Sequence, residues 1–168
     1  MNEGCEFMVP KDIAIKLANN PAHQIIDNDR DAYRVPPNTI FPEDVDLLKL
    51  EMSKVIHRYK DKYVAIHKTR CDQYDIVSNA CDIPASSIKH MLNGRQRITR
   101  HQLGKFCVGL KLSIEEAQQL FKWQGRSLCV GEDAFDTVVY YALKDEDDIW
   151  DFIDEAAEIA RVNLHKEN

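Results

Sequence analysis

Residues 77–94 decide the fold and read Val-Ser-Asn-Ala-Cys-Asp-Ile-Pro-Ala-Ser-Ser-Ile-Lys-His-Met-Leu-Asn-Gly. The apolar residues recur at the spacing of two short helices that bury one common side. Asp82-Ile83-Pro84 interrupts the pattern, and proline suits the first position of the second helix. Gly94 ends that helix, as glycine does after a helix C-terminus. The stretch therefore predicts two helices joined by a tight turn, with four residues facing inward: Val77, Ile83, Ile88 and Met91.

Basic residues are concentrated around this stretch. Residues 83–114 contain six Lys or Arg and no Asp or Glu. The net charge is −5 over residues 1–48, +8 over residues 49–114 and −9 over residues 115–168, within a chain of net charge −6. Exposed charges more than about 10 Å apart are largely screened at 0.1 M salt, so a basic patch can attract phosphate on an acidic protein. This segregation favours a nucleic-acid surface over ordinary solvated helix faces.

Length and composition limit the class of protein. A chain of 168 residues with 44% hydrophobic residues can bury one core, and only six Gly and six Pro favour helices. No apolar run approaches the roughly 18 residues of a membrane span, and the start of the chain is acidic where a signal peptide is basic. Five dispersed cysteines predict free thiols in a reducing compartment. We therefore expect a cytoplasmic protein with no cofactor. We also expect no metal, since His67 and Cys71 are too few ligands for zinc.

The flanking patterns divide the chain into three parts: an N-terminal arm (1–42), a core (43–125) and an acidic helical extension (126–168). A capping box, Ser113-Ile114-Glu115-Glu116, marks one helix start within the core. No stretch has the pattern of a strand, so the predicted fold class is all-α. Besides the two helices of the central stretch, we expect helices over residues 10–19, 43–68, 99–110, 113–123, 133–144 and 147–164.

Residues 77 to about 120 resemble the Cro/C1-type (Xre-like) helix-turn-helix family. The apolar positions of that motif are held by Val77, Ile83, Ile88 and Met91, and its closing glycine by Gly94. Gly109-Leu110-Lys111-Leu112-Ser113 is similar to the family's "Leu-Gly-Leu-Ser" connection. Three features depart from the pattern: Ser78 replaces a small alanine, Asp82 replaces the glycine of the turn, and the glutamine frequent at the start of the first motif helix is Tyr74 or Gln73, one or two places displaced. The resemblance implies a lambda-repressor-like core over residues 48–123 whose second motif helix enters the DNA major groove.

Polar residues on and after the second motif helix are the candidate contacts with nucleic acid. A helix fits the major groove of B-DNA, where its side chains meet base edges, and nearby Lys and Arg bind phosphates. Each of these residues has the alternative of being a solvated or capping side chain, and the three arginines are the strongest group. The candidate residues are Ser86, Ser87, Lys89, His90, Asn93, Arg95, Arg97 and Arg100.

The first hypothesis is a sequence-specific transcriptional regulator that binds double-stranded DNA as a homodimer, because two-fold pairing doubles the contacts. The alternative is a phage or mobile-element protein that keeps the fold and inhibits a host or defence protein or a ribonucleoprotein, in the manner of an anti-CRISPR. Its partner would contact the N-terminal arm or the acidic C-terminal helices. We expect no enzyme, since the chain has no glycine-rich phosphate loop, no Gly-x-Ser-x-Gly and no His-Glu-x-x-His.

Overall fold

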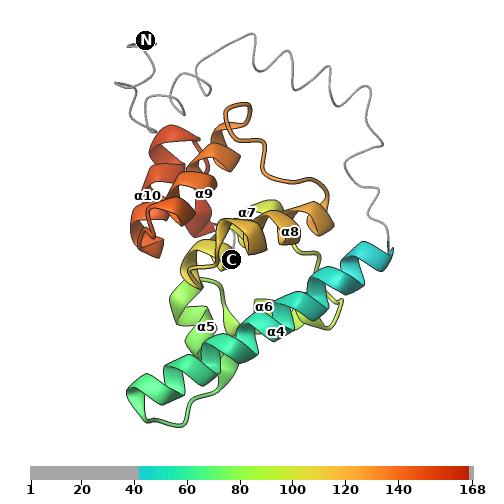
Figure 1. Ribbon diagram of the computed structural model, residues 1–168, viewed down its shortest axis with the longest axis vertical. Coiled ribbons are helices and arrows are strands. Elements are labelled where there is room, and N and C mark those ends of the chain that lie inside the picture. The colour runs from blue at the N-terminus through green and yellow to red at the C-terminus, as the bar shows by residue number, and fades with distance from the viewer. Residues whose placement is uncertain (1–41, 167–168) are drawn as a thin grey trace.

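The computed structural model describes residues 42–166. The arm expected over residues 1–42, with its helix at 10–19, lies outside the described residues except for Pro42. Between residues 42 and 166 the chain is all-helical, which confirms the predicted class there (Figure 1). None of these helices combines the length and the apolar character needed to cross a membrane. The elements are α4 (Pro42–His67), α5 (Gln73–Cys81), α6 (Ala85–Leu92), α7 (Arg100–Gly109), α8 (Ile114–Gln124), α9 (Ala134–Lys144), α10 (Ile149–Ile159) and the 3₁₀ turn η1 (Leu164–Lys166).

Side chains that cap the helix N-termini set most of these boundaries. Asp72 accepts a hydrogen bond from the backbone N–H of Tyr74 and so begins α5. Ser113 accepts one from the N–H of Glu116, which is one half of the predicted capping box. The Glu116 carboxylate accepts instead from the Ser113 hydroxyl and from Arg58. Thr99 and Gln102 form a complete capping box at the start of α7. Each such cap stabilises its helix by about 1 kcal/mol, because it satisfies a backbone donor that has no partner within the helix.

Two of the expected helices differ in detail. The second motif helix begins at Ala85, with Pro84 as its N-cap rather than its first residue. The last helix was expected to continue to residue 164, but α10 ends at Ile159. The backbone of Arg161 there takes the left-handed conformation (φ 58°), which breaks the helix and returns Leu164 to the core.

Burial fades along the long helix α4. Its buried residues end at Ile56, and the stripe then continues through half-buried Tyr59 and Tyr63. Ile66, which follows Tyr63 at helical spacing, is 74% exposed. On α10, Ala157 is exposed although its neighbour Ala156 is buried.

Helix α7 is the centre of the molecule. Every residue from 102 to 108 is buried, because α5 and α8 pack on the helix as well as α9 and α10 (Figure 1). Gly109 permits the closest of these contacts, since an added Cβ there would lie 2.5 Å from the carbonyl oxygen of Ala80 on α5. The apolar side chains of all seven helices form one continuous cluster.

Candidate nucleic-acid interface

The α5–turn–α6 unit is held in place by one buried side. The four residues predicted to face inward, Val77, Ile83, Ile88 and Met91, are each at most 2% exposed, which confirms the prediction. Asp82 has the left-handed backbone (φ 54°, ψ 43°) that glycine adopts most easily, and its N–H donates to the carbonyl of Ser78. Aspartate tolerates this conformation better than most residues. The turn therefore forms although the residue there is not glycine.

The opposite side of α6 faces solvent. Ser86, Lys89 and His90 are exposed, and Ser87 is half-buried. The ammonium group of Lys89 lies 5.2 Å from the ring centroid of Tyr74 on α5. This cation–π contact joins the outer surfaces of the two helices.

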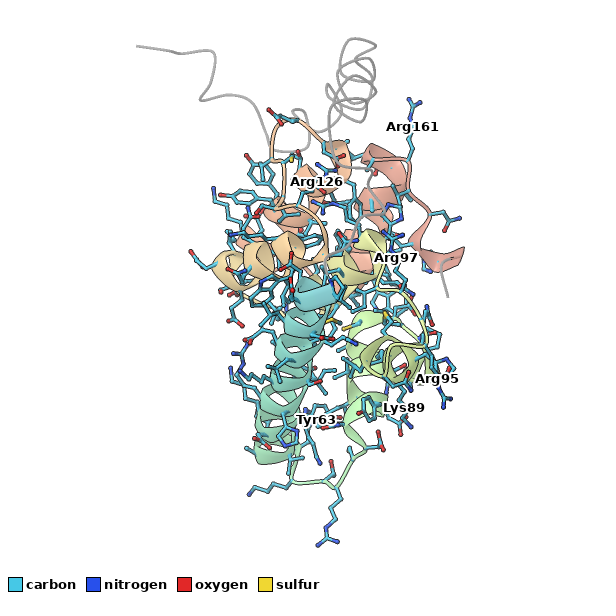
Figure 2. The ribbon with its side chains drawn as sticks, turned by 90° about the vertical axis from the view of Figure 1, so that its right-hand side faces the viewer. Tyr63, Lys89, Arg95, Arg97, Arg126 and Arg161 are labelled. Atoms are coloured by element: carbon cyan, nitrogen blue, oxygen red, sulfur yellow. The ribbon has the colours of Figure 1, made fainter. Side chains whose placement is uncertain are left out.

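The loop after α6 folds back on the helix and presents two arginines. The side chain of Asn93 accepts a hydrogen bond from the N–H of Arg95 at 3.1 Å, and the N–H of Gln96 donates to the carbonyl of His90 at 3.0 Å. Asn93, Arg95 and Arg97 are all exposed. Figure 2 shows Lys89, Arg95 and Arg97 along one edge of the molecule, with α4 on the other side. We call Lys89, Arg95 and Arg97 the basic edge.

Arg100 was expected to contact nucleic acid, and the structure corrects this. Its side chain is only 17% exposed and is bound by the fully buried carboxylate of Asp136 on α9, at 2.7 Å and 2.9 Å. Its guanidinium also lies 4.7 Å from the ring centroid of Phe121. The basic side chain of Arg100 thus joins α7 to α9 instead of facing outward.

Lys105, which contributed to the basic charge of the central segment, is also withdrawn from the surface. It is 1% exposed, and its ammonium donates to the carbonyl of Leu164 at 3.1 Å and lies 3.5 Å from the carboxylate of Asp82. Of the six basic residues between residues 83 and 114, four remain exposed: Lys89, Arg95, Arg97 and Lys111.

The structure brings further residues to this surface that are not among the candidate contacts. Lys49 on α4 lies beside the loop, with its ammonium 3.6 Å from the position of a Cβ added at Gly94. Tyr74 lies beneath Lys89. In Figure 2 Arg161 lies farther along the same side as the basic edge. Helical spacing places Lys49 off the inward stripe of α4, among side chains able to reach phosphates, but no local motif indicates Arg161, because it comes from a distant part of the chain.

The chemistry of this surface consists of cations, hydroxyls and amides. The nearby thiols of Cys81 and Cys107 are fully buried, and burial raises the pKa of both well above the usual thiol range. A buried thiol of this kind stays protonated and unreactive. Among residues 42–166 no group of three or more His, Cys, Asp or Glu side chains is arranged to hold a metal ion.

Comparison of the chain with protein-family models, with curated proteins and with solved structures gave no match.

Proposed function

We propose that this chain binds double-stranded DNA through α6 and the following loop, and acts as a sequence-specific transcriptional regulator with a lambda-repressor-like helix-turn-helix core. The observation that carries the proposal is the two-sided character of α6. Ile88 and Met91 anchor the helix in the core, while Ser86, Lys89 and His90 are exposed on its outside. A helix held in this way can lie in the major groove and present polar groups to base edges.

The basic edge supplies the phosphate contacts of the proposed complex. Arg95 and Arg97 follow α6 directly, where a loop beside the groove meets the DNA backbone. Lys49 on α4, whose ammonium also lies 3.4 Å from the Asp46 carboxylate, adds a hydrogen-bond donor beside the loop. The acidic residues after residue 114 lie mainly on α9, α10 and the segment that joins them. Figure 1 shows α9 and α10 at the opposite end of the molecule from the C-terminal end of α4, at His67. We propose a homodimer as the DNA-bound form, since a single module buries only about 600–1,000 Å².

The test is fluorescence anisotropy of a labelled random-sequence duplex, titrated with protein at several salt concentrations. The variant Arg95→Glu/Arg97→Glu removes two cations of the basic edge. The matched control, Lys122→Glu/Lys144→Glu, makes the same change in net charge at exposed positions of α8 and α9.

We expect wild type and control to bind with an affinity that falls steeply with salt, and the basic-edge variant to lose binding. Where weak binding remains, the salt slope should be smaller by about 2, because each lost phosphate contact removes about 0.9 from it. Equal affinity of the basic-edge variant and wild type would disprove the assignment. An equal loss in the control would show only general charge attraction.

A protein partner is the second candidate function, as an inhibitor of a host or defence protein or ribonucleoprotein encoded by a phage or mobile element. Trp150 on α10 favours it, because this large apolar side chain is 51% exposed beside the exposed acids Asp151 and Asp154. Tryptophan is enriched among the residues that dominate binding energy in protein interfaces. A pull-down that returns one stoichiometric protein, lost with Trp150→Ala, from a chain that does not bind duplex DNA would support this function.

A further inference from the structure

A polar cavity of about 270 Å³ lies between the middle of α4 and the turn that joins α7 to α8. Three cationic side chains line it: Arg58 and Lys62 from α4, and Lys111 from the turn. Apolar side chains line the rest, from Val55, Leu110 and Leu112. None of these residues belongs to α5, α6 or the loop after α6, so the cavity is separate from the basic edge.

The cations of the cavity outnumber its acids. Glu116 is the one acid among the described lining residues, and its carboxylate accepts a hydrogen bond from Arg58 at 2.5 Å. This pairing orients the guanidinium and neutralises one positive charge, which leaves Lys62 and Lys111 as an excess of two. The ammonium of Lys111 donates one hydrogen bond to the backbone carbonyl of Glu146 at 3.1 Å. Its two other N–H groups can donate to a ligand.

Tyr59 adds a neutral donor to the wall of the cavity. Partial burial raises the pKa of its phenol above the ordinary value of 10.0. The hydroxyl is therefore protonated at neutral pH. It can donate a hydrogen bond to an anion without adding negative charge.

We infer that this cavity binds a small organic phosphate ester. A phosphate monoester carries close to two negative charges at neutral pH, which matches the excess of two cations, and its oxygens can accept from lysine, arginine and phenol donors together. Val55, Leu110 and Leu112 border the cavity but are almost fully buried, so they offer contact only to a small organic part. The volume is just below the usual range for small-molecule sites, so the ligand is small.

The backbone at the cavity allows a sharp test. Lys111 has a left-handed conformation (φ 53°), and so does the exposed Lys68 in the loop after α4 (φ 52°). Glycine adopts this conformation without strain. Lys111→Gly and Lys68→Gly therefore remove the same charge and relieve the same kind of backbone strain, one at the cavity and one away from it. Both variants should keep the fold, which circular dichroism melting would check.

Binding would be measured by isothermal titration calorimetry with two probes, glycerol 3-phosphate and inorganic phosphate, at ionic strength held constant with sodium chloride. We expect saturable one-to-one binding of glycerol 3-phosphate, tighter than that of inorganic phosphate. Lys111→Gly should weaken it about tenfold, the size expected for losing one hydrogen bond to a charged group. Lys68→Gly and Arg95→Glu/Arg97→Glu should bind the ester as wild type does, whether or not the chain binds DNA.

Four results would overturn the proposal. Absence of saturable binding of both probes would exclude the site, and equal weakening by Lys68→Gly would show general surface charge. Glycerol 3-phosphate binding no tighter than inorganic phosphate would exclude an organic ligand. Duplex DNA binding that is lost in Lys111→Gly, without any binding of the ester to wild type, would instead make the cavity a contact for backbone phosphates.

Discussion

Replacing Arg100 with leucine tests whether its guanidinium holds the fold together. All five N–H groups of this side chain have acceptors. Nε and Nη2 donate to the carboxylate of Asp136, Nη2 also to the carbonyl of Ser127 at 3.2 Å, and Nη1 to the carbonyl of Arg126 at 2.9 Å and the amide oxygen of Gln124 at 3.3 Å. The leucine variant removes every one of these bonds and leaves the Asp136 carboxylate buried.

The expected loss in the free energy of unfolding depends on the contacts that Asp136 keeps in the leucine variant. Removing one member of a buried ion pair costs about 3–5 kcal/mol, because the other charge is left unpaired in a poorly solvated place. Asp136 would keep the N–H of Cys129 at 2.9 Å and the guanidinium of Arg126 at 3.4 Å. These two contacts place the cost near the lower end, at about 3 kcal/mol. With a urea m-value of about 2 kcal/mol/M, the unfolding midpoint should fall by about 1.5 M.

The assay is urea unfolding followed by circular dichroism. Arg95→Leu is the matched control, since Arg95 is exposed and its loss should change the free energy of unfolding by no more than about 0.5 kcal/mol. Arg100→Lys keeps the charge without the planar fork of donors, so its stability should lie between that of Arg100→Leu and wild type. Suppose instead that Arg100→Leu is as stable as Arg95→Leu and loses duplex binding. The structural role would then be refuted, and Arg100 would return to the set of nucleic-acid contacts.

Further predictions concern close packing and the thiols. Gly109→Ala should lower the free energy of unfolding by about 1–3 kcal/mol, because the new methyl group meets the backbone of α5; an unchanged urea midpoint would contradict this. A thiol reagent such as dithionitrobenzoate should label partly exposed Cys71 and Cys129 in the native protein, and buried Cys81 and Cys107 only on unfolding; rapid native labelling of all four would contradict it. The pKa values of Cys81 and Cys107 are raised in the folded protein, so as the pH rises these thiols ionise in the unfolded chain before they ionise in the folded one. In the unfolded chain they ionise near the ordinary thiol pKa of 9.0. The free energy of unfolding should therefore fall above about pH 9 by up to about 1.4 kcal/mol per pH unit for each thiol, and a profile that stays flat in the Cys81→Ala/Cys107→Ala variant but not in wild type would assign the fall to them.

The helices were predictable where short-range rules decide them. Asp72 and Ser113 cap helices through hydrogen bonds to residues two or three positions ahead, so the neighbouring residues in the sequence are enough to predict these caps. The inward positions of α5 and α6 follow from helical spacing alone. The end of α10 was not predictable in this way, because it depends on the chain turning at Arg161 to bring Leu164 against α7.

In the candidate site, too, local features were predictable from the sequence and contacts between distant residues were not. Arg95 and Arg97 were expected at the surface and are exposed there. Arg100 was assigned to that surface because it follows them closely, whereas its partner, Asp136, lies 36 residues farther along the chain. The cavity beside Lys111 was invisible in the sequence for the same reason. It joins α4 to a turn about fifty residues later, and only the packing of those elements brings their charges together.

The central position of α7 has a consequence for how far this molecule can be divided. An independent domain carries its own complete hydrophobic core. A neighbouring domain can then be removed without unfolding it. Here both halves of the described chain use the same helix as their shared wall. Deleting α9, α10 and η1 would expose its apolar surface and leave the Lys105 ammonium without the Leu164 carbonyl. Neither half of the described chain therefore has a complete core without the other, and hydrogen exchange should find them opening as a single cooperative unit.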